Sequence, residues 1–182
     1  MKRIVCLFLL ITMLLCSGYR KPYKYTIDAG KDAYFHNNVG LNYLRDRIYY
    51  AAIQEFKIAI QLSPNTQATA VFKTNLGETY MYIGYPDMAR TCFEDALNNY
   101  WLNFQYYINL AKCYKNLNIA ESKINELSSS GKISDKILLG VLYIQTERKQ
   151  RGIFILDDIC ASEPDLLIVP AIRQYINSLS DT

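Results

Sequence analysis

The sequence predicts an all-α protein in which antiparallel helix pairs stack in a row to form an α-solenoid. The first observation is an internal repeat, because the residues after Gly40 and those after Gly77 match in type at offsets of 3, 12, 16 and 19 residues. The second is that a similar pattern returns late in the chain, after Gly140. The third is an apolar segment over residues 165–182, which is typical of a helix that caps the end of a stack.

Each repeat has the composition of a helical hairpin. A glycine lets two antiparallel helices approach closely, and small and aromatic residues at the later offsets fill the seam between them. The pattern is clear in three units. The residues that carry it are Gly40, Tyr43, Ala52, Phe56, Ala59 and Pro64 in the first unit, Gly77, Tyr80, Ala89, Phe93 and Ala96 in the second, and Gly140, Tyr143, Gly152, Leu156, Ile159 and Pro164 in the fourth.

The third unit is weaker than the others. Ala111 takes the glycine position and Tyr114 follows it at the usual offset, but Ala120, Ile124 and Leu127 continue the pattern three residues early. This shift predicts a short connecting turn. The anchors of the four units are therefore 37, 34 and 29 residues apart.

The order Leu-Gly, Tyr, Ala, Phe, Ala and a closing Pro resembles the tetratricopeptide repeat (TPR) family. The resemblance implies a right-handed superhelix of helix pairs with a concave groove that binds polypeptide. We expect a capping helix over residues 165–182, which Pro170 either starts or kinks. The four units are expected over about residues 31–66, 68–103, 104–131 and 132–164.

The first 18 residues predict an export signal, since a basic pair at residues 2–3 precedes an apolar run over residues 4–15 and small residues follow. The run is shorter than the roughly 20 residues that a membrane-spanning helix needs. Three interpretations remain open, namely cleavage after Gly18, lipid attachment at Cys16 and an uncleaved anchor. Each places the repeats outside the cytoplasm, in a periplasm or on a cell envelope.

The composition argues against several classes of partner and site. With 20 basic and 17 acidic residues, the net charge of +3 is too small to predict nucleic-acid binding or a polybasic membrane patch. Membrane contact is expected only through the N-terminal segment, in which residues 19–30 form a linker. The sequence contains one histidine, His36, and no complete catalytic motif, so we predict neither metal, cofactor nor enzymatic activity.

Three cysteines follow the signal, namely Cys92, Cys113 and Cys160. An odd number argues against a disulfide framework, even in an oxidising compartment. Cys92 and Cys113 belong to helices that should pack together, so a bridge between them and a pair of buried thiols both remain open. The oligomeric state stays open as well.

Helix geometry separates groove-facing residues from seam residues, because each residue is rotated by about 100° from the one before. Asn38, Asn75 and Asn109 each stand two residues before a seam glycine or alanine. An asparagine amide pairs with both the N–H and the C=O of an extended peptide. This column is similar to the asparagine ladder in the TPR superhelix of O-linked N-acetylglucosamine transferase. The other predicted groove residues are Tyr34, Arg45, Glu78, Tyr82, Lys112, Leu138 and Val141.

Leu138 interrupts the asparagine column, and with Val141 it forms an apolar patch that is either a side-chain pocket or a face covered by the last helix. Our functional hypothesis is a non-catalytic module that binds an extended polypeptide in the concave groove. The alternative is an envelope assembly factor, similar to the TPR lipoproteins that help pilus or secretion complexes form, acting through its convex face or its ends.

Overall fold

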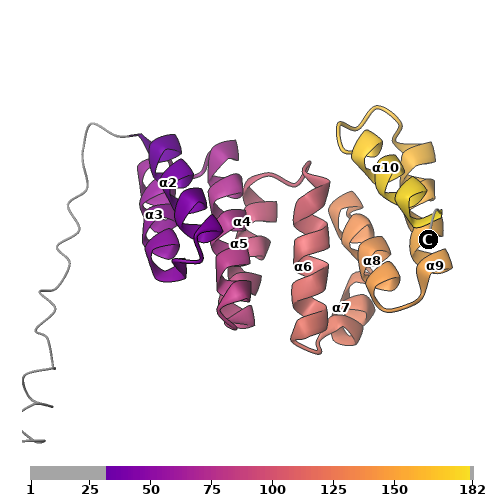
Figure 1. Ribbon diagram of the computed structural model, residues 1–182. Coiled ribbons are helices and arrows are strands. Elements are labelled where there is room, and N and C mark those ends of the chain that lie inside the picture. Colours follow the sequence, from indigo (N-terminus) through magenta and orange to yellow (C-terminus); the bar gives the residue numbers. More distant parts are fainter. Residues whose placement is uncertain (1–31, 181–182) are drawn as a thin grey trace, which may run out of the picture.

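The computed structural model describes residues 32–180, and this part of the chain is an all-α row of helix pairs (Figure 1). The helices pair in chain order, α2 with α3, α4 with α5, α6 with α7 and α8 with α9, and α10 follows the last pair. This arrangement confirms the predicted solenoid with a C-terminal capping helix. The bounds are α2 Ala33–Arg45, α3 Tyr49–Leu62, α4 Gln67–Tyr82, α5 Pro86–Asn99, α6 Phe104–Asn116, α7 Ala120–Leu127, α8 Ile133–Gln145, α9 Lys149–Ser162 and α10 Val169–Ser180.

In the first two pairs, a glycine of the first helix faces a phenylalanine of the second. A Cβ atom at Gly40 would lie 2.6 Å from Phe56 Cε1, and one at Gly77 would lie 2.7 Å from Phe93 Cε1. Both rings are fully buried, so they fill the space that the glycines leave. The small and large residues that define the repeat in the sequence are therefore the two sides of one contact.

The fourth pair uses the same contact with different residues. A Cβ atom at Gly140 would lie 2.8 Å from Leu156 Cγ. A Cβ atom at Gly152 would meet the carbonyl oxygen of Gly140, which shows that the backbones of α8 and α9 approach closely there. Glycine on both helices makes this approach possible.

The four turns within the pairs share one backbone geometry. In each, the carbonyl oxygen of a tyrosine accepts a hydrogen bond from the amide five residues later, at 2.8 to 3.0 Å. The fourth residue after the tyrosine has a positive φ, namely Arg47 (60°), Gly84 (80°), Asn118 (57°) and Glu147 (66°). The turn of the third unit is therefore as long as the others, and the prediction of a short turn there is wrong.

This register changes the interpretation of the third unit. Lys123 stands nine residues after Tyr114, which is the seam position that Ala52 and Ala89 hold in the first two units. In addition, α7 has 8 residues where α5 has 14, so the missing residues come from the end of the second helix. Because α7 is shorter and has a lysine at the seam position, it packs less extensively on α6 than α5 does on α4.

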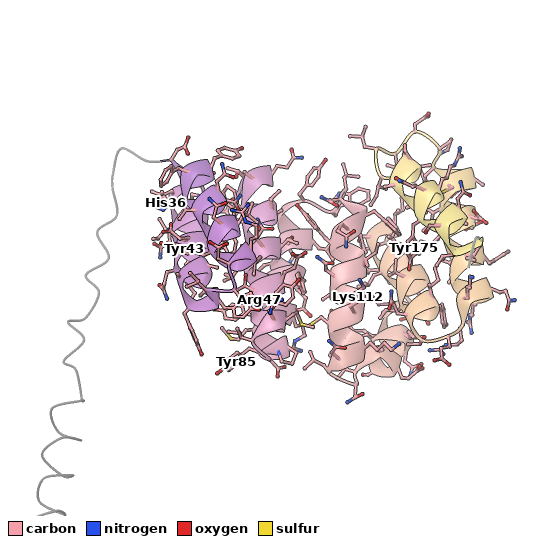
Figure 2. The ribbon with its side chains drawn as sticks, viewed as in Figure 1. His36, Tyr43, Arg47, Tyr85, Lys112 and Tyr175 are labelled. Carbon is pink, nitrogen blue, oxygen red and sulfur yellow. The ribbon has the colours of Figure 1, made fainter. Side chains whose placement is uncertain are left out.

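One apolar core runs through the row from α3 to α10. Ile168 and Ile172, at the start of the capping helix, are almost completely buried in it. Pro170 is the second residue of α10, so it starts the helix and does not kink it. Tyr175 on α10 lies against Phe104 of α6, with ring centroids 5.2 Å apart, so the cap reaches past the last pair (Figure 2).

The predicted signal over residues 1–18, with Cys16, and the predicted linker over residues 19–30 lie outside the described residues. Among the helices between residues 32 and 180, none combines the length and the apolar character that crossing a membrane requires.

Candidate peptide-binding groove

The predicted groove residues of the first two units lie on the surface. Tyr34 on α2 is 60% exposed and Tyr82 on α4 is 66% exposed. Asn38 and Arg45 are also exposed. The ring of Tyr82 stacks on Tyr49 of the neighbouring pair, with centroids 6.0 Å apart and an interplanar angle of 16°. This contact fixes the ring and leaves one of its faces to solvent.

The first two asparagines of the column differ in how free their amides are. Asn38 is exposed and makes no side-chain hydrogen bond with any other described residue. Asn75 is half-buried, and its amide nitrogen donates to Asn37 Oδ1 at 2.7 Å. This bond joins α4 to α2, and it leaves the side-chain oxygen of Asn75 as the group that can accept a hydrogen bond from a ligand.

The third asparagine is engaged on both sides of its amide. Asn109 is buried, its nitrogen donates to Glu78 Oε1 at 2.8 Å, and its oxygen accepts from Gln105 Nε2 at 2.9 Å. A peptide would have to displace both bonds to pair with this amide. Of the three asparagines in the predicted column, Asn38 has an amide that is open to a ligand, and Asn75 has only its side-chain oxygen available. The amide of Asn109 holds α6 to α4.

A pocket of about 460 Å³ lies between α4 and α6 beside Asn109. Lys112 is exposed at this pocket, and it forms no ion pair with any residue between 32 and 180. Figure 2 shows Lys112 midway along α6, near the centre of the row. The pocket is lined by Glu78, Met81, Tyr82, Phe93, Gln105, Asn109, Lys112 and Asn116. It brings together one positive and one negative charge, three carboxamides and two aromatic rings.

The two apolar groove residues of the fourth unit are not on an open surface. Val141 is fully buried and Leu138 is 7% exposed. Both belong to the core that contains Val169 and Ile172 of the last helix. Leu138 also lines a cleft formed with α5, α6 and α7, so the patch is divided between the core and a side-chain pocket.

The lone histidine of the sequence is buried in the first pair. His36 Nδ1 lies 2.7 Å from Glu55 Oε2, and the two side chains are 4% and 7% exposed. The contact joins α2 to α3 within the core of the pair and opens on no groove. Residues 32–180 include no group of three or more His, Cys, Asp and Glu side chains that could hold a metal ion.

The three cysteines of the described chain are free thiols, so the Cys92–Cys113 bridge is not formed here. The Cys113 thiol donates to the carbonyl oxygen of Pro86 at 3.2 Å. Burial raises the pKa of Cys92 to about 11 and that of Cys113 to about 11. Both groups are therefore protonated at neutral pH and act as small apolar side chains.

Four further residues contribute to this face, and two of them, Asn37 and Tyr49, did not stand out in the sequence. Asn37 and Tyr49 hold groove residues in place, while Gln105 and Asn116 line the pocket. The helical rotation that selects Asn109 and Lys112 also selects Gln105 and Asn116, so that signal was present. No comparable signal exists for Asn37, because its role depends on how α2 and α4 pack.

Comparisons with known proteins agree on one fold. A family model described as Tetratricopeptide repeat matches residues 71–99, which fall within α4 and α5. No curated protein sequence matches the chain.

Solved structures extend the likeness to most of the chain. PilF of Pseudomonas aeruginosa is similar with a TM-score of 0.51 and 15% identity, over 81% of this chain and 68% of that one. A tetratricopeptide repeat protein from Parabacteroides merdae gives a TM-score of 0.51 and 18% identity, over 82% and 61% of the two chains. MamA gives a TM-score of 0.50 and 16% identity, over 81% and 90%. Identities this low establish the solenoid fold alone.

Proposed function

The chain is a tetratricopeptide-repeat protein, and we propose that it binds an extended segment of another polypeptide in its concave groove, without chemistry of its own. The fold supports a protein–protein interaction module, because stacked helix pairs present a long continuous surface. The more specific proposal concerns where on that surface the partner lies and what it contacts.

The observation that carries the proposal is the pocket beside Lys112. The ammonium group of Lys112 has no ion-pair partner among residues 32–180. Asn116, one helical turn further along α6, is exposed and lines the same pocket. A carboxylate on the partner would pair with Lys112 and accept from the Asn116 amide. Asn38 and the ring of Tyr82 would hold the neighbouring part of the same segment.

We also propose that the groove works outside the cytoplasm, in a periplasm or at a cell envelope. The support is the basic pair and apolar run at the start of the sequence. The membrane would then be contacted only through this N-terminal segment, by a lipid on Cys16 or by an anchor where no cleavage occurs.

The test is a pull-down from envelope extract with residues 19–182 as bait. One variant carries Asn38→Ala, Lys112→Ala and Asn116→Ala, all at exposed positions, so that the core is untouched. Asn109 is left intact because its amide holds α6 to α4. Circular dichroism checks that the variant is folded.

A matched control replaces two asparagines and one lysine elsewhere, through Lys57→Ala, Asn125→Ala and Asn177→Ala, which are also exposed. We expect a specific partner to be captured by the parent and the control and lost by the groove variant. If the groove variant retains the partner, the groove proposal is wrong. Attention then moves to an assembly role through the convex face or the ends of the stack.

A further inference from the structure

A second cleft lies between α5, α6, α7 and the start of α8. Its volume is about 820 Å³, within the range of roughly 300–1,000 Å³ that ligand pockets have. It shares no lining residue with the pocket beside Lys112. The lining residues are Glu94, Leu97, Asn98, Trp101, Tyr107, Leu110, Tyr114, Lys123, Glu126, Leu127, Lys132, Ile133, Ser134, Asp135 and Leu138.

The shortened third unit explains why this cleft exists. In the first and second units the end of the second helix carries Ala59 and Ala96, which are fully buried. The third unit has no helix at the corresponding place, because α7 ends at Leu127 and Ser128–Gly131 follow. The cleft therefore occupies the volume that the last turns of a full-length helix would fill.

Lys123 distinguishes the seam of this unit from those of the first two units. Its side chain lines the cleft at the position where the first two units have a seam alanine. The ammonium group lies 5.6 Å from the centroid of the Tyr114 ring and forms an ion pair with Glu126 at 2.8 Å.

Part of the wall of the cleft is apolar, and the hydroxyls of its two tyrosines are already hydrogen-bonded. Tyr107 donates its hydroxyl to the carbonyl oxygen of Trp101 at 2.8 Å, and Tyr114 donates to Glu94 Oε1 at 2.8 Å. The apolar part of the wall consists of leucine, isoleucine and aromatic side chains. Such a surface binds apolar side chains rather than polar small molecules.

The rim of the cleft carries charges of both signs. Glu94, Glu126 and Asp135 are its acids, and Lys123 and Lys132 are its bases. Lys132 is exposed and forms no ion pair with any described residue, so it is available to a carboxylate. An acyl chain would leave Lys132 unpaired, whereas a helix with an acidic residue on its flank would pair with it.

We propose that this cleft is the docking site for a short amphipathic helix of a partner protein, which completes the third repeat. The helix would place apolar side chains, spaced by three and four residues, against Leu97, Trp101 and Leu110. It would thus take the place that the end of the second helix occupies in the other units. An acidic residue on its flank would pair with Lys132. This site is separate from the groove and does not depend on a groove ligand.

The test uses a phage-displayed library of peptides of about 14 residues, near the length at which isolated helices begin to form. Residues 19–182 serve as the immobilised protein, since the core described above lies within residues 32–180. Counter-selection uses Ser134→Phe, which fills the cleft from α8, and Asn98→Phe, which fills it from α5. Ser122→Phe, an exposed change on α7 outside the cleft, is the matched control.

Trp101 provides the binding signal, because it lines the cleft and is the one tryptophan of the chain. We expect selected peptides to have apolar residues at helical spacing and to shift Trp101 emission to shorter wavelength in a saturable way. Their affinity should fall by at least about tenfold in both filled variants and stay unchanged in Ser122→Phe, as for loss of a buried anchor.

Three results would overturn the proposal. The first is a selection in which no peptide distinguishes the parent from the filled variants. The second is a Trp101 emission that shifts with protein concentration alone, which would make a second copy of the chain the occupant. The third is an apolar dye that binds the parent and not Ser134→Phe while no peptide does so, which would indicate a small-molecule pocket.

Discussion

The contact between Gly77 and Phe93 allows a sharp test of how the repeat is held together. In a helix interior, replacing glycine by alanine raises the free energy of unfolding by about 1 kcal/mol. Here, however, the added Cβ atom would lie 2.7 to 3.0 Å from three atoms of the Phe93 ring, which is 1% exposed. Forcing a methyl group into such a packed seam costs about 1–3 kcal/mol.

Because the contact is shorter than an ordinary van der Waals distance for all three ring atoms, the cost belongs in the upper part of that range. We therefore expect Gly77→Ala to lower the free energy of unfolding by about 1–2 kcal/mol after the helix gain is subtracted. In the Phe93→Ala background the ring is gone, and the same substitution should stabilise by about 1 kcal/mol. The sign of the effect reverses.

Urea unfolding followed by circular dichroism, on the parent, both single variants and the double variant, measures this cycle. Gly131→Ala is the control, because a Cβ atom there meets nothing within 4 Å, and its effect should stay within about 0.5 kcal/mol. If Gly77→Ala has the same sign with and without the Phe93 ring, the seam does not work by steric fit and the reasoning fails.

Three further predictions follow from the turns, the third unit and the thiols. Glu147→Gly should stabilise by about 0.5–1 kcal/mol in thermal or urea unfolding, because Glu147 has a φ of 66° that glycine adopts without strain; a loss of stability would contradict this. Lys123→Ala should change stability by less than about 1 kcal/mol, since its ion pair with Glu126 is partly exposed. The reverse change, Ala89→Lys, should lower the free energy of unfolding by at least about 3 kcal/mol, because Ala89 is fully buried; effects of equal size at the two positions would contradict this. Burial raises the pKa of Cys92 and Cys113 to about 11, above the value in the unfolded chain, so the folded chain keeps protons that the unfolded chain loses. The free energy of unfolding should therefore stay level up to about pH 9 and fall between about pH 9 and 11, and alanine at both cysteines should reduce this fall, which urea midpoints across that range would measure.

The fold was predictable from the sequence because its repeat consists of residue pairs that touch. Gly40 with Phe56 and Gly77 with Phe93 recur at one offset, and each pair is one close contact between two helices. A pattern produced by contact geometry survives in the sequence whatever the surface residues are. The capping helix was predictable for a related reason, since the last pair needs an apolar cover.

The third unit was placed in the wrong register because residue types were matched without the turn. Ala120, Ile124 and Leu127 imitate the small and large positions three residues early, whereas the backbone of the turn keeps its full length. Asn118 was the available signal. It stands four residues after Tyr114, as Gly84 stands four after Tyr80, and asparagine is favoured at positive φ.

The sequence predicted which side chains of the proposed groove face are exposed, but not which hydrogen bonds they make. Helical rotation correctly assigns Tyr34, Asn38 and Tyr82 to the exposed face, because that depends on one helix at a time. The bond between Asn109 and Glu78 depends on the distance between α4 and α6, which no periodicity encodes. The asparagine ladder stays a prediction, with Asn38 as its most accessible member.

The irregular third unit is where stability and function are most clearly separated. The first two units show that this chain closes its seams with alanine and a long second helix, and the third departs from both features at once. If Lys123→Ala has little effect on stability, the lysine is not retained for folding. Its side chain lines a cleft that contains the one tryptophan and a rim of both charges. Departures from local rules that bring no stability are expected at binding sites, and this reasoning singles out the third unit, rather than the more regular ones, as the place to look for a second partner.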